Sequence, residues 1–154
     1  MDVPSETTAT LDMLRASRAY VTSHGGALRR PVMITGFSQG ASAGLGLGRA
    51  LQDGADPWFR LGALAPISGP YDVGGAALPS VLNATDDEQA VNANTFHCQA
   101  WFAASGAHVP TINLGTPDYQ GSRHLGSNVA GTASIVRWFL RLTSAGAEDG
   151  TQGV

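Results

Sequence analysis

A short apolar stretch followed by a glycine-flanked serine constrains this chain more than any other feature. Val32-Met33-Ile34 predicts a buried strand over about residues 31–36, and Gly36-Phe37-Ser38-Gln39-Gly40 then has the pattern G-x-S-x-G. A stretch rich in small residues follows and predicts a helix over about residues 39–52. Strand, sharp turn and helix are the context in which this pattern forms a nucleophile elbow, which lifts one serine clear of a sheet. Both flanking glycines are expected to be needed, because the strained turn leaves little room for side chains.

The predicted helix after the serine contains an unusual number of glycines. Each glycine inside a helix costs roughly 0.5–1 kcal/mol relative to alanine. We expect a close approach of this helix to the sheet to offset that cost, since only glycine allows two backbones to come so near. The glycines are Gly40, Gly44, Gly46 and Gly48.

The rest of the chain alternates predicted helices and strands. Apolar spacing and turn residues predict helices over about 5–24, 94–105 and 129–142, and strands over about 61–67, 80–83 and 109–114. This alternation indicates an α/β fold: a mostly parallel sheet of about four strands, flanked by helices, with catalytic groups at the carboxyl ends of the strands. We expect a single domain over residues 1–143. The small and polar residues 144–154 predict a disordered tail.

The elbow resembles that of the α/β-hydrolase superfamily, of the bacterial lipase and esterase type. Asn83-Ala84-Thr85-Asp86-Asp87-Glu88-Gln89 resembles the family's acid-bearing turn, although its first two residues stand where the family has His and Gly. Arg123-His124-Leu125-Gly126-Ser127 resembles the family's Asp-His-x-x-Ser segment, with Arg in place of the first Asp. The resemblance covers about residues 5–143, but only the carboxyl-terminal half of the family's fold. It implies a truncated α/β-hydrolase fold without a lid.

A serine nucleophile needs a base and a carboxylate that orients the base, and in this family they follow the serine in the order acid, then histidine. The resemblance therefore implies Ser38 as nucleophile, Asp87 as acid and His124 as base. His124 lies between the last predicted strand and the last helix, which is where the family places its base. The other histidines, His24, His97 and His108, lie in less suitable places. Three further carboxylates stay open as the acid: Asp86, Asp72 and Asp118.

An oxyanion hole needs two backbone donors, and the N–H of Gln39, directly after the nucleophile, would be one. His24-Gly25-Gly26 looks like the family's second donor, but it follows a predicted helix rather than a strand, so we do not assign it that role. Without the family's amino-terminal strands, strand 31–36 becomes a sheet edge. An apolar edge strand invites pairing with another chain, which would include a second copy of this one.

These features predict a serine hydrolase that cleaves carboxylic esters, with short acyl chains favoured, through an acyl-serine intermediate. The alternative is a catalytically weak or inactive remnant of such an enzyme, or one half of a split hydrolase that pairs through its edge strand. The net charge of −3 gives no basic footprint for nucleic acid. Neither the histidines nor Cys98 have metal-ligand spacing, so we expect no metal and no other cofactor.

Targeting signals are equally sparse. We find no apolar run long enough to span a membrane. The amino terminus lacks the charged and apolar regions of a signal peptide. As it stands the chain is expected to be cytoplasmic, or secreted if an amino-terminal segment is missing.

Overall fold

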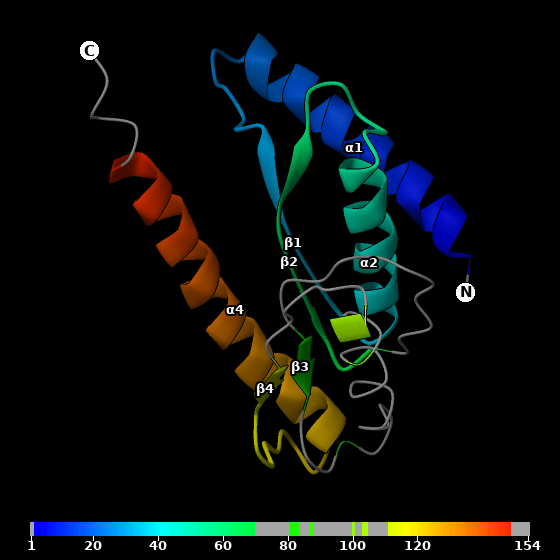
Figure 1. The fold of residues 1–154 in the computed structure, drawn as a ribbon, viewed down its shortest axis with the longest axis vertical. Helices are drawn as coiled ribbons and strands as arrows, with labels where there is room; N and C mark the ends of the chain where they lie inside the picture. Colours follow the sequence, from blue (N-terminus) through cyan, green and yellow to red (C-terminus); the bar gives the residue numbers. More distant parts are fainter. Residues whose placement is uncertain are drawn as a thin grey trace.

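The fold is described from a computed structural model, shown in Figure 1. The structure describes residues 2–69, 81–83, 87, 100, 103–104 and 111–148. Its elements are α1 (Val3–Ser23), β1 (Pro31–Phe37), α2 (Gln39–Gln52), β2 (Arg60–Ile67), β3 (Val81–Asn83), β4 (Thr111–Asn113) and α4 (Arg123–Glu148). The protein is therefore of the α/β class, as the alternating pattern predicts. Of the predicted helix over 94–105, only residues 100, 103 and 104 are described, and these are helical.

All paired strands run parallel, in the order β1-β2-β3-β4. β1 and β2 form the extended part of the sheet, with Pro31 opposite Arg60 at one end and Phe37 opposite Ile67 at the other. The predicted strands over 31–36 and 61–67 and the helix over 39–52 agree with β1, β2 and α2 to within one residue. Among the described strands β1 is an end strand. Helices α1 and α2 cover one face of the sheet and α4 the other (Figure 1).

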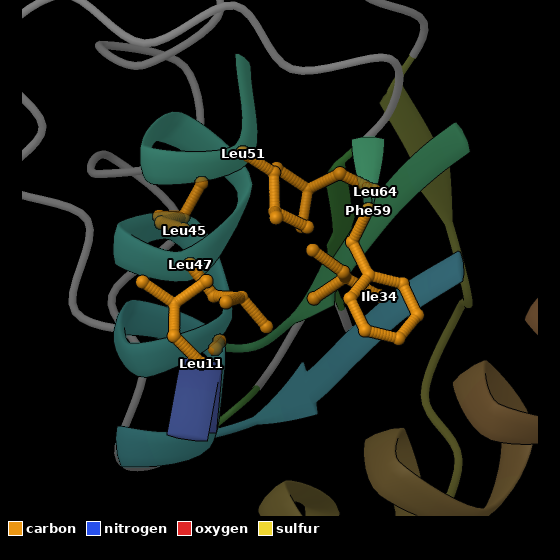
Figure 2. Close-up of a cluster of buried hydrophobic side chains, with 8 residues drawn as sticks. Leu11, Ile34, Leu45, Leu47, Leu51, Phe59 and Leu64 are labelled. Atoms are coloured by element: carbon orange, nitrogen blue, oxygen red, sulfur yellow. The ribbon is translucent and has the colours of Figure 1, made fainter. Parts of the chain in front are cut away.

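The main core lies between the sheet and the α1–α2 layer. Its side chains come from α1, β1, α2, β2 and the residue directly before β2, and they point toward one another in Figure 2: Leu11, Ile34, Leu45, Leu47, Leu51, Phe59 and Leu64. Added Cβ atoms would lie only 3.2 Å from Ile34 at Gly44 and 2.8 Å from Leu64 at Gly48. The expected close approach of α2 to the sheet is thereby confirmed, and burial against β1 and β2 offsets the propensity cost of these glycines.

The last helix differs from its prediction at both ends. It begins at Arg123 rather than near residue 129, because the Ser122 hydroxyl accepts a hydrogen bond from the N–H of Leu125 (3.2 Å), the bond of an N-cap residue. His124 thus lies in the first turn of α4 and not in a loop. At the other end α4 continues to Glu148, so residues 144–148, which we expected in a disordered tail, are helical.

Candidate active site

The serine of the G-x-S-x-G pattern is the N-cap residue of α2, with a φ of 53° and a ψ of −122°. A positive φ is uncommon for a residue other than glycine, and such backbone strain costs of order 1–3 kcal/mol. Two backbone bonds hold Ser38 in this conformation. Its N–H donates to the carbonyl of Ile67 (3.1 Å), and its own carbonyl accepts from the N–H of Ala41 (3.0 Å). The sharp strand-to-helix turn that the sequence predicts is therefore present at Ser38.

The two glycines of the pattern differ in what they do. A Cβ added at Gly36 would overlap the carbonyl group of Gly40, since the end of β1 passes directly beside the first turn of α2. A Cβ added at Gly40 meets nothing within 4 Å in the part of the chain that the structure describes. Within the described residues, no contact supports the expectation that Gly40 is needed for space. At Gly36 the expected need for space is confirmed.

Gln39 is the first residue of α2, where N–H groups have no partner within the helix and carry the positive end of its dipole. Its side-chain amide donates to Glu6 Oε1 of α1 over 2.7 Å. This contact ties the first turn of α1 to the residue beside Ser38. The turn that carries the Gln39 N–H is therefore held by the backbone bonds of Ser38 and by the contact between Gln39 and Glu6.

Asp87 and His124 form a buried pair. His124 Nδ1 lies 2.8 Å from Asp87 Oδ1 and 2.9 Å from Oδ2, and the two side chains are 5% (His124) and 1% (Asp87) exposed. Asp87 follows β3, and His124 belongs to the first turn of α4. The structure thus brings together the acid and the base that the sequence predicts as first choices.

The alternative acids are placed differently. Asp118 is exposed, and its Oδ1 accepts a hydrogen bond from the N–H of Gly121 (2.9 Å) within the turn before α4. The hydrogen-bonded carboxylate at His124 is that of Asp87, so the prediction of Asp118 as the acid is not supported by this geometry. Asp72 and Asp86 lie outside the described residues.

The ring of His124 packs against the ring of Phe37, with the two centroids 4.4 Å apart and an interplanar angle of 39°. Phe37 is the last residue of β1 and directly precedes Ser38. The histidine that is paired with Asp87 therefore lies beside the strained turn. Ser38 follows β1, Asp87 follows β3 and His124 follows β4. All three therefore lie beyond the carboxyl ends of parallel strands, the edge at which such sheets place their ligands.

Two buried serines that we did not single out as site residues join the same cluster. The Ser127 hydroxyl lies 2.7 Å from the carbonyl of His124, 2.8 Å from Ser68 Oγ and 3.4 Å from Asp87 Oδ2. Ser68 directly follows β2 and has a positive φ of 43°. The position of Ser127 three residues after His124 was a signal in the sequence. No local pattern marks Ser68.

His24-Gly25-Gly26 lies elsewhere. His24 is the C-cap residue of α1, Gly25 has the positive φ typical of a helix end (78°), and the segment precedes the amino end of β1. It is a helix terminus and not an oxyanion loop. His97 and His108 lie outside the described residues.

Within the described residues, no group of three or more His, Cys, Asp or Glu side chains could hold a metal ion. None of the described helices combines the length and the apolar character that a membrane span requires. Comparison with protein families, with curated proteins and with solved structures finds no match for this chain.

Proposed function

We propose that the protein is a serine hydrolase that cleaves carboxylic esters, built on the carboxyl-terminal half of an α/β-hydrolase-type fold. One observation carries the proposal. A buried, hydrogen-bonded Asp87–His124 pair lies against the residue that precedes a serine with a φ of 53°. Nucleophile, carboxylate and base, in this chain order and at one sheet edge, are the parts that acyl transfer to serine requires.

The Asp87–His124 hydrogen bond defines the role of each group. An ionised carboxylate can only accept, so Nδ1 of His124 carries the proton and Nε2 is left as the base. In the proposed mechanism Ser38 Oγ attacks the ester carbonyl while Nε2 takes the hydroxyl proton. The backbone N–H of Gln39 stabilises the oxyanion, and the imidazolium then protonates the leaving alcohol. Water hydrolyses the acyl-serine by the reverse proton transfers, which restores the free enzyme.

The proposed substrate class follows from the open site that the sequence suggests. Residues 68–80, between β2 and β3, are too few for a large inserted lid, and several residues of the elbow, Gly36, Gly40 and Ala41, are small. Short acyl chains are therefore favoured over long lipids. We assign one oxyanion donor, Gln39, and the loss of one such donor typically costs about 10²–10³ in turnover.

The test combines an active-site label with turnover. Purified protein is exposed to a fluorophosphonate probe, and hydrolysis of p-nitrophenyl acetate is measured in parallel. We expect labelling and turnover in the wild type, and loss of both in Ser38→Ala and His124→Ala. Ser23→Ala is the matched control, because Ser23 lies exposed at the end of α1, where its hydroxyl donates to the carbonyl of Tyr20 (2.8 Å). That variant should behave as the wild type. A folded wild type that is neither labelled nor active would overturn the proposal.

A second candidate function rests on β1, the end strand of the described sheet. An end strand presents unpaired N–H and C=O groups that can pair with a strand from another chain. The protein would then be an inactive or weak hydrolase unit that pairs through β1, with another half or with a second copy. Light scattering gives the native mass: twice the chain mass supports pairing with a second copy, and the chain mass alone excludes it.

A further inference from the structure

The buried hydroxyl of Ser127 connects three segments that must meet to form the proposed acid–base pair. It belongs to α4, and it contacts Ser68 at the end of β2 and Asp87 after β3. Ser127 and Ser68 are 0% and 2% exposed, so no bulk water replaces these contacts. A buried hydroxyl group without partners is costly, which ties the positions of the three segments to one another.

The hydroxyl protons determine how these bonds are arranged. The carbonyl of His124 and the carboxylate of Asp87 only accept, so each bond to them must use a hydroxyl proton. Ser127 has one such proton, and the shorter of its two bonds, 2.7 Å, goes to the His124 carbonyl. Ser68 then donates to Ser127 across 2.8 Å. When the Ser127 proton turns toward Asp87 Oδ2, the same two oxygens hold the carboxylate that orients His124.

Strain at Ser68 is an independent sign that this pair matters. Its φ of 43° is sparsely populated by residues other than glycine, and such strain persists only where surrounding contacts overdetermine it. In the parallel register Phe37 lies opposite Ile67, so Ser38 and Ser68 leave adjacent strands side by side. Two strained serines thus occupy equivalent positions at the carboxyl edge of the sheet. Ser38 is the proposed nucleophile, and Ser68 is hydrogen-bonded to Ser127.

We propose that Ser127 and Ser68 form a hydroxyl pair that positions Asp87 and His124 for catalysis. The inference rests on the proposed function, and it assigns neither serine contact with the substrate. The Ser127 proton bonds the His124 carbonyl in one arrangement and the Asp87 carboxylate in the other, and Ser68 donates to Ser127 in both. Without these bonds the imidazole can leave the orientation in which it takes the proton of Ser38.

The first experiment records the low-field proton resonance of the His124–Asp87 hydrogen bond by NMR. It needs no activity, and therefore separates this inference from the proposed function. In Ser127→Ala we expect the resonance to shift and broaden, because Asp87 loses a donor and His124 loses its anchor. Ser144→Ala is the matched control: Ser144 lies exposed on the same helix, and its hydroxyl bonds the carbonyl of Leu140 (2.9 Å). That variant should leave the resonance unchanged.

Kinetics give the second readout. Ser127→Ala should lower kcat for p-nitrophenyl acetate by about 10–100-fold with KM unchanged, because the reacting groups are misplaced while the substrate contacts remain. Ser68→Ala should have a smaller effect of the same kind. The double variant should be no worse than Ser127→Ala alone, since hydroxyls that act as one pair are not additive.

Each outcome decides the matter. A wild type without the resonance, or a folded Ser127→Ala variant with unchanged resonance and kcat, would overturn the inference. An inactive wild type whose resonance shifts in Ser127→Ala would overturn the proposed function but retain the positioning role. If Ser127→Ala fails to fold, Ser68→Ala is measured instead, because it removes the other hydroxyl of the Ser68–Ser127 hydrogen bond. An unchanged resonance in Ser68→Ala would then overturn the inference as well.

Discussion

Each end of the sheet buries one aspartate beside a basic side chain, and the two pairs are built differently. Before the amino end of β2, Asp56 Oδ2 accepts from Nε of Arg15 over 2.9 Å. Its Oδ1 accepts from the N–H groups of Trp58 (2.9 Å) and Phe59 (2.7 Å). At the carboxyl end, Asp87 instead faces His124. The Asp56 and Asp87 side chains are 5% and 1% exposed, so burial alone does not distinguish them.

The partners do distinguish them. The N–H of Phe59 holds the pKa of Asp56 below its usual value; burial opposes this, while the N–H of Trp58 and the Arg15 guanidinium lower the pKa further. All of these donors keep their protons throughout the physiological pH range, so Asp56 is a fixed ion that joins α1 to the start of β2. A guanidinium stays protonated, whereas in the proposed mechanism the imidazole of His124 takes a proton and returns it. A buried carboxylate beside such a partner is suited to proton transfer, and one beside Arg15 is not.

The largest expected effect is at the carboxyl end. Asp87→Asn should lower kcat/KM for p-nitrophenyl acetate by about 10³–10⁴-fold, because the amide does not hold His124 in the required tautomer. Circular dichroism should show an unchanged fold. The matched control is Asp56→Asn, in which the other buried aspartate changes in the same way and the rate per folded molecule should be that of the wild type. Equal losses of kcat/KM in Asp87→Asn and Asp56→Asn would contradict the proposal that Asp87, and not Asp56, acts in catalysis.

The amino end should respond in stability instead. Asp56→Ala leaves the buried N–H groups of Trp58 and Phe59 without their acceptor, which should lower the free energy of unfolding by about 2–4 kcal/mol in urea titrations. The control is Asp53→Ala, which removes an exposed i, i+4 pair with Arg49 and should change stability by less than about 1 kcal/mol. If Asp56→Ala lowered the free energy of unfolding as little as Asp53→Ala, the bonds of Asp56 to the two backbone N–H groups would not contribute to stability.

The pH dependence tests the same assignment. Because the pKa of Asp56 is lowered in the folded state, its contribution to stability is complete above the unfolded-state value of about 3.9 and is lost as pH falls through the folded-state value. Urea titrations from pH 7 to pH 2.5 should therefore show a constant gap between wild type and Asp56→Ala down to about pH 4, then a narrowing gap. A gap that stays constant to pH 2.5 would contradict a lowered pKa.

The elements that could be predicted from sequence are those whose signals are local. The β1–elbow–α2 unit is coded within about twenty consecutive residues, and its strained serine lies where G-x-S-x-G places it. The end of β3 and the start of α4 carried enough of a family resemblance to suggest Asp87 and His124. The start of α4 itself was misplaced, because the small residues after Ser122 hide the helical apolar spacing.

What could not be predicted depends on contacts between distant segments. Arg15 and Asp56 are 41 residues apart in the chain, and Ser68 and Ser127 are 59 apart. Periodicity also says which face of a helix is apolar but not which parts of that face a neighbour covers. Long-range pairing of this kind requires the fold, so the Arg15–Asp56 and Ser68–Ser127 contacts could not be predicted from the sequence.

The smallest expected effect concerns Arg15, the charged partner of Asp56 at the amino end of the sheet. Arg15→Met keeps much of the apolar stem but removes the charge. Arg15 is 47% exposed, so solvent screens the ion pair, and the two backbone bonds to Asp56 remain. The melting temperature at pH 7 should fall less than in Asp56→Ala. Because loss of the guanidinium raises the pKa of Asp56 toward its unfolded-state value, the free energy of unfolding should fall less steeply below about pH 4 than in the wild type.

The comparison of Arg15→Met with Asp56→Ala decides what holds the amino-end carboxylate. If the two variants lose the same stability, the charge of Arg15 and not the backbone N–H groups is the dominant partner, and Asp56 becomes an ion pair like any other. If Arg15→Met is the milder change, the backbone itself fixes Asp56 as an ion whether or not a cation is present. At Asp87 the partner is the imidazole of His124. In the proposed mechanism this side chain takes a proton and returns it, which the guanidinium beside Asp56 does not do.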